Sequence, residues 1–228
     1  MKNLFMKNLF VVALLSLAAT MIAKAEATVT ITPTKGGLQI KGDSEYLKFT
    51  LGYPVLISSD KKKTYKNGGV EVKDNTAVLK YNGGGELTIA IDPSGTITLT
   101  GNNLPADVGY VEMRMVIAQS FKVGGTYQLG ANAAKPFPEI KPDKPQLFQG
   151  DEAILIIRAG DKKGLIFTIP PYSYQEVTDF REWNTQSFGW MSQAKYTPGA
   201  SLTYKIEDAG PGPAAAADGA ATPAPAAQ

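Results

Sequence analysis

The chain has 228 residues, 23 of them basic and 21 acidic, and it contains neither histidine nor cysteine. The missing histidine excludes Ser-His-Asp catalysis and nearly all catalytic zinc sites, and the missing cysteine excludes disulfides and thiol nucleophiles. Removing the three lysines among residues 1–25 takes the 23 basic residues to 20, and this near-neutral charge argues against a nucleic-acid partner.

The first 25 residues have the pattern of an export signal. A lysine-bearing start precedes the apolar run 9–19, and Ala23-Lys24-Ala25 has the small-x-small form of a signal peptidase site. The run is too short to span a membrane, which needs roughly 20 apolar residues. We therefore expect a signal peptide over 1–25, a secreted or periplasmic protein and no membrane span.

From residue 28 onward, short alternating runs are separated by Gly, Asn, Asp and Pro, a pattern typical of strands. The segment GELTIAIDPSGTITLTG predicts a hairpin. Its turn, Asp92-Pro93-Ser94-Gly95, has a proline that fixes φ and a glycine that accepts positive φ. Other early strands are expected at 28–32, 38–41, 46–51, 70–72 and 77–81.

Residues 110–118 are expected to form a strand with one face in the core and Glu112, Arg114 and Val116 on a partly wet face. The four prolines of 131–149 predict a long, stiff crossing loop. Residues 153–158 and 165–169 are apolar on both faces, which favours a place in the middle of the structure. A last strand is expected at 201–206.

Together these runs suggest about thirteen to fifteen strands, too many for one open sheet. We predict an all-β, single-domain fold over 26–208, a two-sheet antiparallel β-sandwich of jelly-roll or supersandwich-like form. Residues 209–228, rich in alanine and proline, cannot bury enough apolar surface to fold and are expected to be a disordered tail.

The stretch PYSYQEVTDFREWNTQSFGW, residues 171–190, contains both tryptophans of the chain. Alternation predicts that Phe188 and Trp190 share a face in the core. It also divides the preceding strand into two faces, with Tyr174, Glu176, Thr178 and Phe180 on one and Ser173, Gln175, Val177 and Asp179 on the other.

Trp183 lies in the polar connection DFREWNTQ, where an indole could stack on a sugar while its neighbours hydrogen-bond the hydroxyl groups. In the alternative, Trp183 folds back as a lid over the end of the sandwich and Arg181 pairs with Asp179 or Glu182. On the first interpretation the candidate ligand-binding residues are Tyr172, Tyr174, Asp179, Arg181, Trp183 and Asn184.

The run GDEAILIIRAGDKKGLIFTIPPYSYQEVTDFREWNTQSFGW, after the loop PFPEIKPDKPQLFQG, resembles the accessory N-terminal β-sandwich domains of secreted polysaccharide-degrading proteins. The shared features are the Pro-rich loop, the QG turn, the hairpin and the Arg-x-Trp segment. More distantly, the sandwich is similar to the galactose-mutarotase-like class. The resemblance implies a role in glycan handling, but it carries over no catalytic residue, because that class relies on histidines.

The leading hypothesis is a non-catalytic module that binds a polysaccharide or oligosaccharide. A second is a structural or interaction protein of the cell envelope with a protein partner. A third is a lyase acting on uronate-containing glycans, with Tyr174, Arg181 and Lys195 as its working residues. No cofactor is expected, although turn aspartates leave a structural calcium ion open. These are Asp43, Asp60, Asp74 and Asp92.

Overall fold

The computed structural model describes residues 29–43, 46–159, 163–183, 185 and 187–210. The expected signal peptide, 1–25, and residues 211–228 of the expected tail lie outside these ranges. Within the described ranges no helix is long and apolar enough to cross a membrane.

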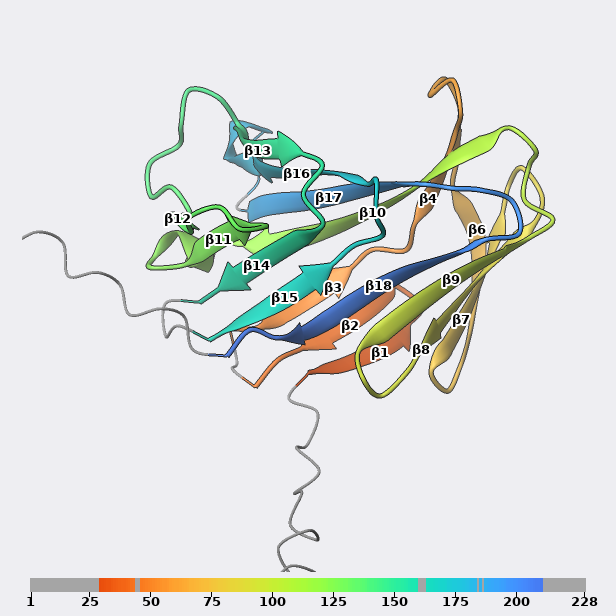
Figure 1. Cartoon of the computed structure of the whole chain (residues 1–228), viewed down its shortest axis with the longest axis horizontal. Helices are drawn as coiled ribbons and strands as arrows, with labels where there is room; N and C mark the ends of the chain where they lie inside the picture. The colour runs from red at the N-terminus through yellow and green to blue at the C-terminus, as the bar shows by residue number, and fades with distance from the viewer. Residues whose placement is uncertain (1–28, 44–45, 160–162, 184, 186, 211–228) are drawn as a thin grey trace, which may run out of the picture.

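The described chain forms eighteen strands and two single-turn 3₁₀ helices, η1 (Gln119–Lys122) and η2 (Phe180–Trp183). Figure 1 shows the strands arranged in two layers that face each other. The strands are β1 (Thr30–Thr34), β2 (Gly37–Lys41), β3 (Lys48–Leu51), β4 (Val55–Ser58), β5 (Thr64–Tyr65), β6 (Asn67–Lys73), β7 (Thr76–Tyr81), β8 (Glu86–Ile91), β9 (Thr96–Asn102), β10 (Val108–Ala118), β11 (Thr126–Leu129), β12 (Lys135–Pro136), β13 (Gln146–Gly150), β14 (Ile154–Arg158), β15 (Gly164–Thr168), β16 (Tyr174–Asp179), β17 (Ser187–Lys195) and β18 (Ser201–Asp208).

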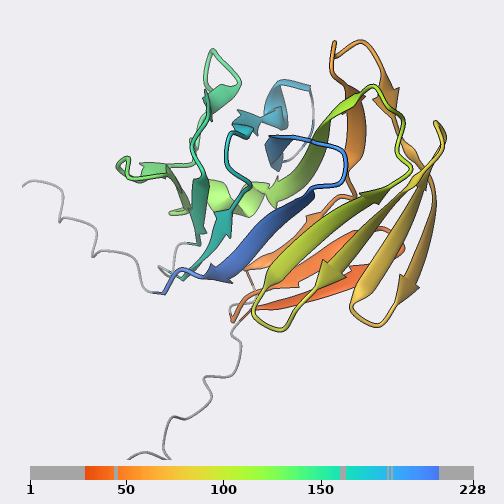
Figure 2. The same cartoon turned by 45° about the vertical axis from the view of Figure 1, so that its right-hand side comes forward.

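Each layer is an antiparallel sheet of nine strands. Sheet A has the order β1-β2-β3-β10-β17-β16-β13, with β4 paired to β10 and β5 paired to β4. Sheet B has the order β12-β11-β14-β15-β18-β9-β8-β7-β6, and its hairpins β6 to β9 lie at the right of Figure 2. The predicted fold class, an all-β sandwich of two antiparallel sheets, is confirmed.

The strand count is higher than expected, because β4, β5 and β11 were not predicted and because the Pro-rich segment 131–149 was predicted to be loop throughout. It contains β12, which pairs with β11 in sheet B, and β13, which pairs with β16 in sheet A. Both are edge strands, where a proline removes no ladder hydrogen bond. The segment does cross from one sheet to the other, as predicted.

The core lies between the sheets and is held together by aromatic contacts that join them. The ring of Phe167, in sheet B, lies 5.6 Å from that of Trp190 and 6.2 Å from that of Phe49, both in sheet A. Phe188 contacts Phe137 at 4.7 Å. Phe188 and Trp190 are 0% and 2% exposed, so their predicted core position is confirmed.

One buried polar chain accompanies these rings. Trp190 donates its indole N–H to Oε1 of Gln175 at 2.8 Å, and Gln175 donates its amide to the backbone oxygen of Glu152. Gln175 is fully buried on the inner face of β16. Because buried donors need partners, these bonds fix β16 and β17 against the loop before β14.

The paired strands β14 and β15 lie in the middle of sheet B, between β11 and β18, as predicted. Their inner residues, such as Leu155 and Ile157, are fully buried, but Ile156 and Ile166 on the outer face are only half-buried. Burial of both faces was therefore only partly right, because no second layer covers the outer face here. The hairpin at Asp92–Gly95 is confirmed, with β8 paired to β9 and Gly95 at φ 84°.

Candidate functional site

Asp179 and Arg181 form an ion pair that is almost completely removed from solvent. The side chains of Asp179 and Arg181 are 0% and 10% exposed, and Arg181 donates from both Nε and Nη2 to the carboxylate. The N–H of Arg181 also donates to this carboxylate at 3.0 Å. The bonds to Asp179 raise the pKa of Arg181 above its usual value.

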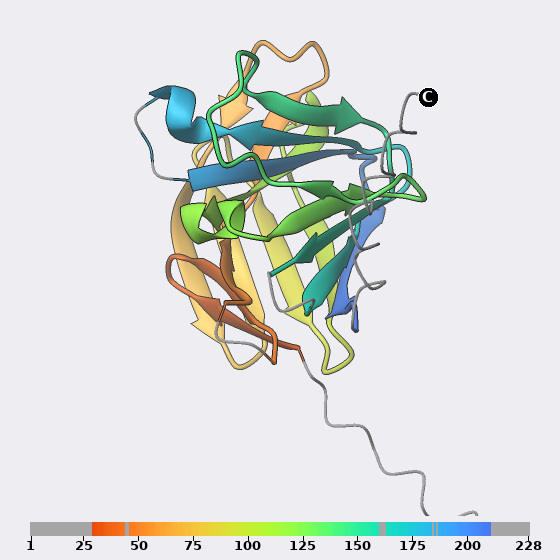
Figure 3. The same cartoon turned by 90° about the vertical axis from the view of Figure 1, so that its left-hand side faces the viewer.

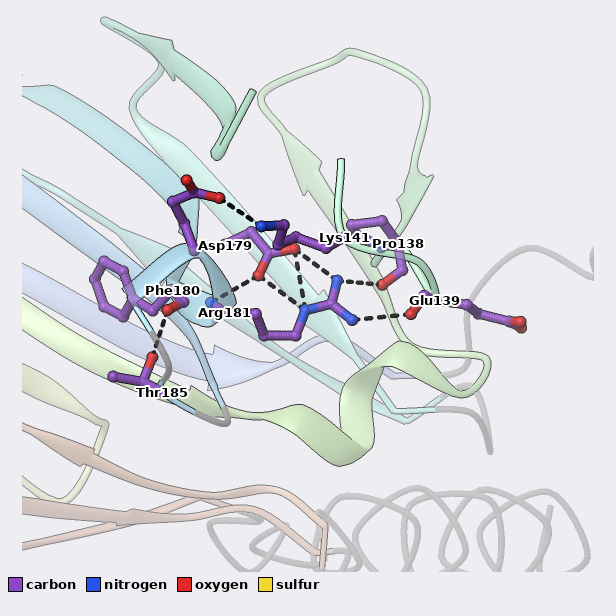
Figure 4. Close-up of polar contacts among 8 residues, drawn as sticks. Pro138, Glu139, Lys141, Asp179, Phe180, Arg181 and Thr185 are labelled. Atoms are coloured by element: carbon purple, nitrogen blue, oxygen red, sulfur yellow. Dashed lines mark hydrogen bonds and ion pairs between the residues drawn. The ribbon is translucent and has the colours of Figure 1, made fainter. Parts of the chain in front are cut away.

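The same guanidinium reaches the Pro-rich segment, as Figure 4 shows. Arg181 donates to the backbone oxygens of Pro138 and Glu139, at 2.7 and 2.9 Å, and its guanidinium lies 4.9 Å from the ring of Phe188. The backbone N–H of Asp179 donates to Pro145. These contacts hold the crossing segment against the end of sheet A. The alternative interpretation of the sequence, in which Arg181 pairs with Asp179, is right about this ion pair.

Trp183 is exposed, with 58% of its surface accessible, and does not fold back as a lid. It is the last residue of η2, the blue turn beyond β16 in Figure 3. Its ring meets the edge of the Phe180 ring at 6.0 Å between centroids. Asn184, the next candidate, lies outside the described residues.

The structure does not bring the predicted ligand-binding residues onto one surface. Tyr172 is 92% exposed but lies in the turn before β16, whereas Trp183 follows the other end of that strand. Tyr172 has φ 58°, which is unusual for a residue other than glycine. Tyr174 faces outward from sheet A and donates its hydroxyl to Glu176 at 3.1 Å. The ligand-binding role of the six residues stays a prediction.

A groove of about 510 Å³ lies on the outer face of sheet A, where β3, β10, β17 and β16 run side by side. It is an open hollow, within the size range of small-molecule sites. Met191 lies between Arg114 and Glu176 in register across β10, β17 and β16. The other residues that line the groove include Thr50, Val116, Thr178 and Phe180.

Two glycines line this groove. Gly189, in β17, presents no side chain, and the ring of Phe180 occupies the space that a Cβ there would enter. Gly52 lies where β10 changes partner from β3 to β4, and its N–H donates to the backbone oxygen of Arg114 at 2.8 Å. Figure 4 shows Phe180 and Arg181 pointing to opposite sides of η2, so the turn supplies both a groove wall and the internal clamp.

The polar groups on the outer face are held by one another. Glu176 accepts hydrogen bonds from the hydroxyls of Tyr174 and Thr178, and desolvation together with the bond to Glu176 raises the pKa of Tyr174. On the other side of Met191, Glu112 accepts Nε–H of Arg114 at 2.7 Å and the Gln193 amide at 3.3 Å. The predicted wet face of β10 is thus confirmed at Arg114, while Glu112 is covered.

Sequence reasoning did not single out the groove, although parts of its signal were readable. Alternation correctly placed Glu176, Thr178 and Phe180 on one face and put Arg114 on a wet face. These faces are joined by the pairing of β10 with β17 and of β17 with β16. No local sequence pattern indicates which strands pair.

The residues proposed for a lyase are divided between the two faces of sheet A. Tyr174 bonds Glu176 on the outer face, and Lys195 follows Met191 at the alternate positions of that face. Arg181 lies against the inward-facing ring of Phe188. The three side chains therefore do not converge.

The turn aspartates do not gather into a cation site. Asp60 accepts hydrogen bonds from Ser58 and Lys62, and Asp92 accepts them from Ser94, as is usual for turn aspartates. Across the part of the chain that the structure describes, no three His, Cys, Asp or Glu residues are grouped so that they could hold a metal ion. A structural calcium ion stays an untested prediction.

No protein-family model and no curated protein sequence matches this chain. Among solved structures, the chain is similar to the α-N-acetylgalactosaminidase NagBb from Bifidobacterium bifidum in its GalNAc complex. The TM-score is 0.54, with 8% identity over 82% of this chain and 36% of that one. A family GH31 sulfoquinovosidase from E. rectale, in complex with an aza-sugar inhibitor, matches with a TM-score of 0.44 and 10% identity, over 77% and 32% of the two chains.

The chain thus spans about a third of the length of each of these structures. At 8% identity, the likeness to the galactosaminidase concerns the fold alone.

Proposed function

We propose that this protein is a non-catalytic carbohydrate-binding β-sandwich module, secreted or periplasmic, and that its ligand lies in the groove on sheet A. The observation that carries the proposal is the combination of an open groove of about 510 Å³ with an aromatic wall and polar groups on both sides. The exposed Trp183 extends the aromatic surface beyond Phe180.

This arrangement suits a sugar because a pyranose has apolar C–H faces and a rim of hydroxyl groups. Phe180 and Trp183 offer ring surface for the C–H groups. Thr178, Glu176 and Arg114 offer hydroxyl, carboxylate and guanidinium groups for the hydroxyls. The site thereby keeps the aromatic surface at Trp183 that the sequence indicated and replaces Asp179 and Arg181, which bind each other.

The test is isothermal titration calorimetry of the protein purified from cells expressing the full chain, against oligosaccharides chosen from a glycan array. Trp183→Ala and Gly189→Val are expected to weaken binding at least about tenfold, which corresponds to 1.4 kcal/mol. Tyr172→Ala is the control, because Tyr172 is also an exposed aromatic, 92% against 58% for Trp183, but it lies at the other end of β16 and does not line the groove. Binding that survives both groove variants, or no binding to any glycan, would refute the proposal.

A further inference from the structure

If the groove binds a carbohydrate, as the proposed function requires, its charged side chains also indicate the class of ligand. We infer that the groove recognises a sugar unit bearing an anionic oxygen group, a carboxylate or a sulfate ester, and that Arg114 is the residue that selects it.

Arg114 is oriented but not saturated. It uses Nε to bind Glu112 at 2.7 Å, while its side chain remains 71% exposed and lines the groove. Among the described residues, no hydrogen bond or ion pair involves its Nη1 or Nη2. Glu112 is only 5% exposed and also bonds Gln193, so it is a fixed anchor that sets the direction of the guanidinium.

Arg181 shows the contrasting case of an arginine whose nitrogens are used within the protein. Arg181 spends Nε, Nη1 and Nη2 on Asp179 and on two backbone oxygens, and its side chain is 10% exposed. Arg158 is half-buried at the end of β14. Arg114 is therefore the arginine that presents both of its terminal nitrogens to the outside of sheet A.

Glu176, on the opposite wall of the groove, does not bind Nη1 or Nη2 of Arg114. Glu176 is two strands away from Arg114, and neighbouring strands lie about 4.8 Å apart, so the two backbones are separated by about 10 Å. Both oxygens of Glu176 already accept hydroxyl hydrogens, from Tyr174 and Thr178. The space between the walls is left for a ligand.

The charge on this face favours an anion. Along the seven-strand path of sheet A, the outward-facing charged residues are four cations and two carboxylates, and one of the carboxylates, Glu112, is covered. The cations are Lys41, Lys48, Arg114 and Lys195, and the carboxylates are Glu112 and Glu176. The protein as a whole is near neutral, so the excess is local to this face.

A planar fork of two N–H donors matches a carboxylate or a sulfate in a bidentate manner, whereas a single hydroxyl uses only one of them. The groove would therefore prefer an acidic sugar unit to its neutral counterpart. The apolar floor at Met191 and the Phe180 wall would contact the ring that carries the acidic group.

The experiment compares matched glycans by calorimetry at 0.15 M salt. Polygalacturonate is paired with its methyl ester, and dextran sulfate with dextran, so that the two sources of negative charge are tested separately. The variants are Arg114→Gln, Arg114→Lys and, as a matched control for loss of one charge on the same face, Lys48→Gln.

We expect at least one acidic glycan to bind about tenfold or more tightly than its neutral partner, as the strength of charged hydrogen bonds implies. Arg114→Gln removes this preference, Arg114→Lys keeps part of it, and Lys48→Gln leaves it nearly unchanged. Circular dichroism establishes that each variant is folded.

Equal affinity for the acidic and neutral forms, or an equal effect of Lys48→Gln and Arg114→Gln, overturns the inference. If a neutral glycan binds and is lost in Gly189→Val but not in Arg114→Gln, the proposed function stands and only the anionic selectivity fails. If no glycan binds, both fail.

Discussion

The ring of Phe180 lies over the backbone of Gly189, in the space that the first carbon of any side chain at residue 189 would occupy. Thr178, two residues before Phe180, pairs with Gly189 across β16 and β17, so the ring folds back onto the strand next to its own. The wall of the groove therefore depends on the absence of a side chain two positions before Met191.

Replacing Gly189 by alanine should displace Phe180 and destabilise the protein by roughly 1–3 kcal/mol, the usual cost of overpacking. Thermal unfolding followed by circular dichroism measures the change. Gly69→Ala is the matched control, because Gly69 also lies in a strand and no atom lies near its missing Cβ. Equal behaviour of the two variants would show that Phe180 has room to move.

Breaking the clamp at η2 should cost far more than breaking a surface ion pair. Arg181→Met leaves the carboxylate of Asp179 fully buried without its cation, and such a loss typically costs about 3–5 kcal/mol. Urea denaturation gives the free energy of unfolding. Lys80→Met, which breaks the exposed pair with Glu71, is the control and should change stability little. A small effect of Arg181→Met would mean that the Pro-rich segment is held by other contacts.

The two tryptophans should respond differently to a quencher in solution. Trp183 is 58% exposed and Trp190 is 2% exposed and hydrogen-bonded to Gln175. Iodide should therefore quench part of the fluorescence of the native protein and leave the rest, and Trp183→Phe should remove the accessible part. Complete shielding of the wild-type signal would contradict the exposed position of Trp183 and with it the aromatic extension of the groove.

Stability should fall in the alkaline range because of buried phenols. Burial raises the pKa of Tyr204 from 10.0 to about 12, and it raises the pKa of Tyr81 as well. Above pH 10 the unfolded chain loses the phenolic proton that the folded chain retains, so the stabilisation present below pH 10 is lost progressively up to pH 12. For Tyr204 this amounts to about 2–3 kcal/mol.

Urea denaturation at pH 8 and at pH 11.5 measures this dependence, and Tyr204→Phe should make it shallower. Tyr46→Phe is a suitable control, because Tyr46 is 56% exposed. A pH dependence that is the same in the wild type and in Tyr204→Phe would assign the alkaline loss to other groups.

The local elements were predictable from the sequence because they depend on local chemistry. Alternation placed Val111, Met113, Met115 and Ile117 inside, and the Asp92–Gly95 turn joined the strands that it was expected to join. The strands β12 and β13 were not predicted, because the prolines of this segment suggested a loop. These prolines lie in or beside edge strands, where a missing backbone N–H donor is tolerated.

The site was less predictable, because its residues are brought together by pairing and not by spacing. Asp179 and Arg181 looked like ligand groups beside Trp183, and alternation alone did not reveal that the backbone oxygens of Pro138 and Glu139 complete the shell of Arg181. The role of Gly189 could not be predicted either. A glycine within a strand indicates that another group packs closely against the backbone, but the sequence does not show that this group is Phe180.

The residues that line the groove are far apart in the sequence. Arg114 and Glu176, on its two walls, are 62 positions apart in the sequence, and Thr50 precedes Arg114 by 64. Pairings between such distant segments carry a large loop-closure cost and slow the folding of β-proteins. If the proposed function is right, ligand binding requires the long-range pairings of sheet A, and no short fragment of the chain should bind the ligand.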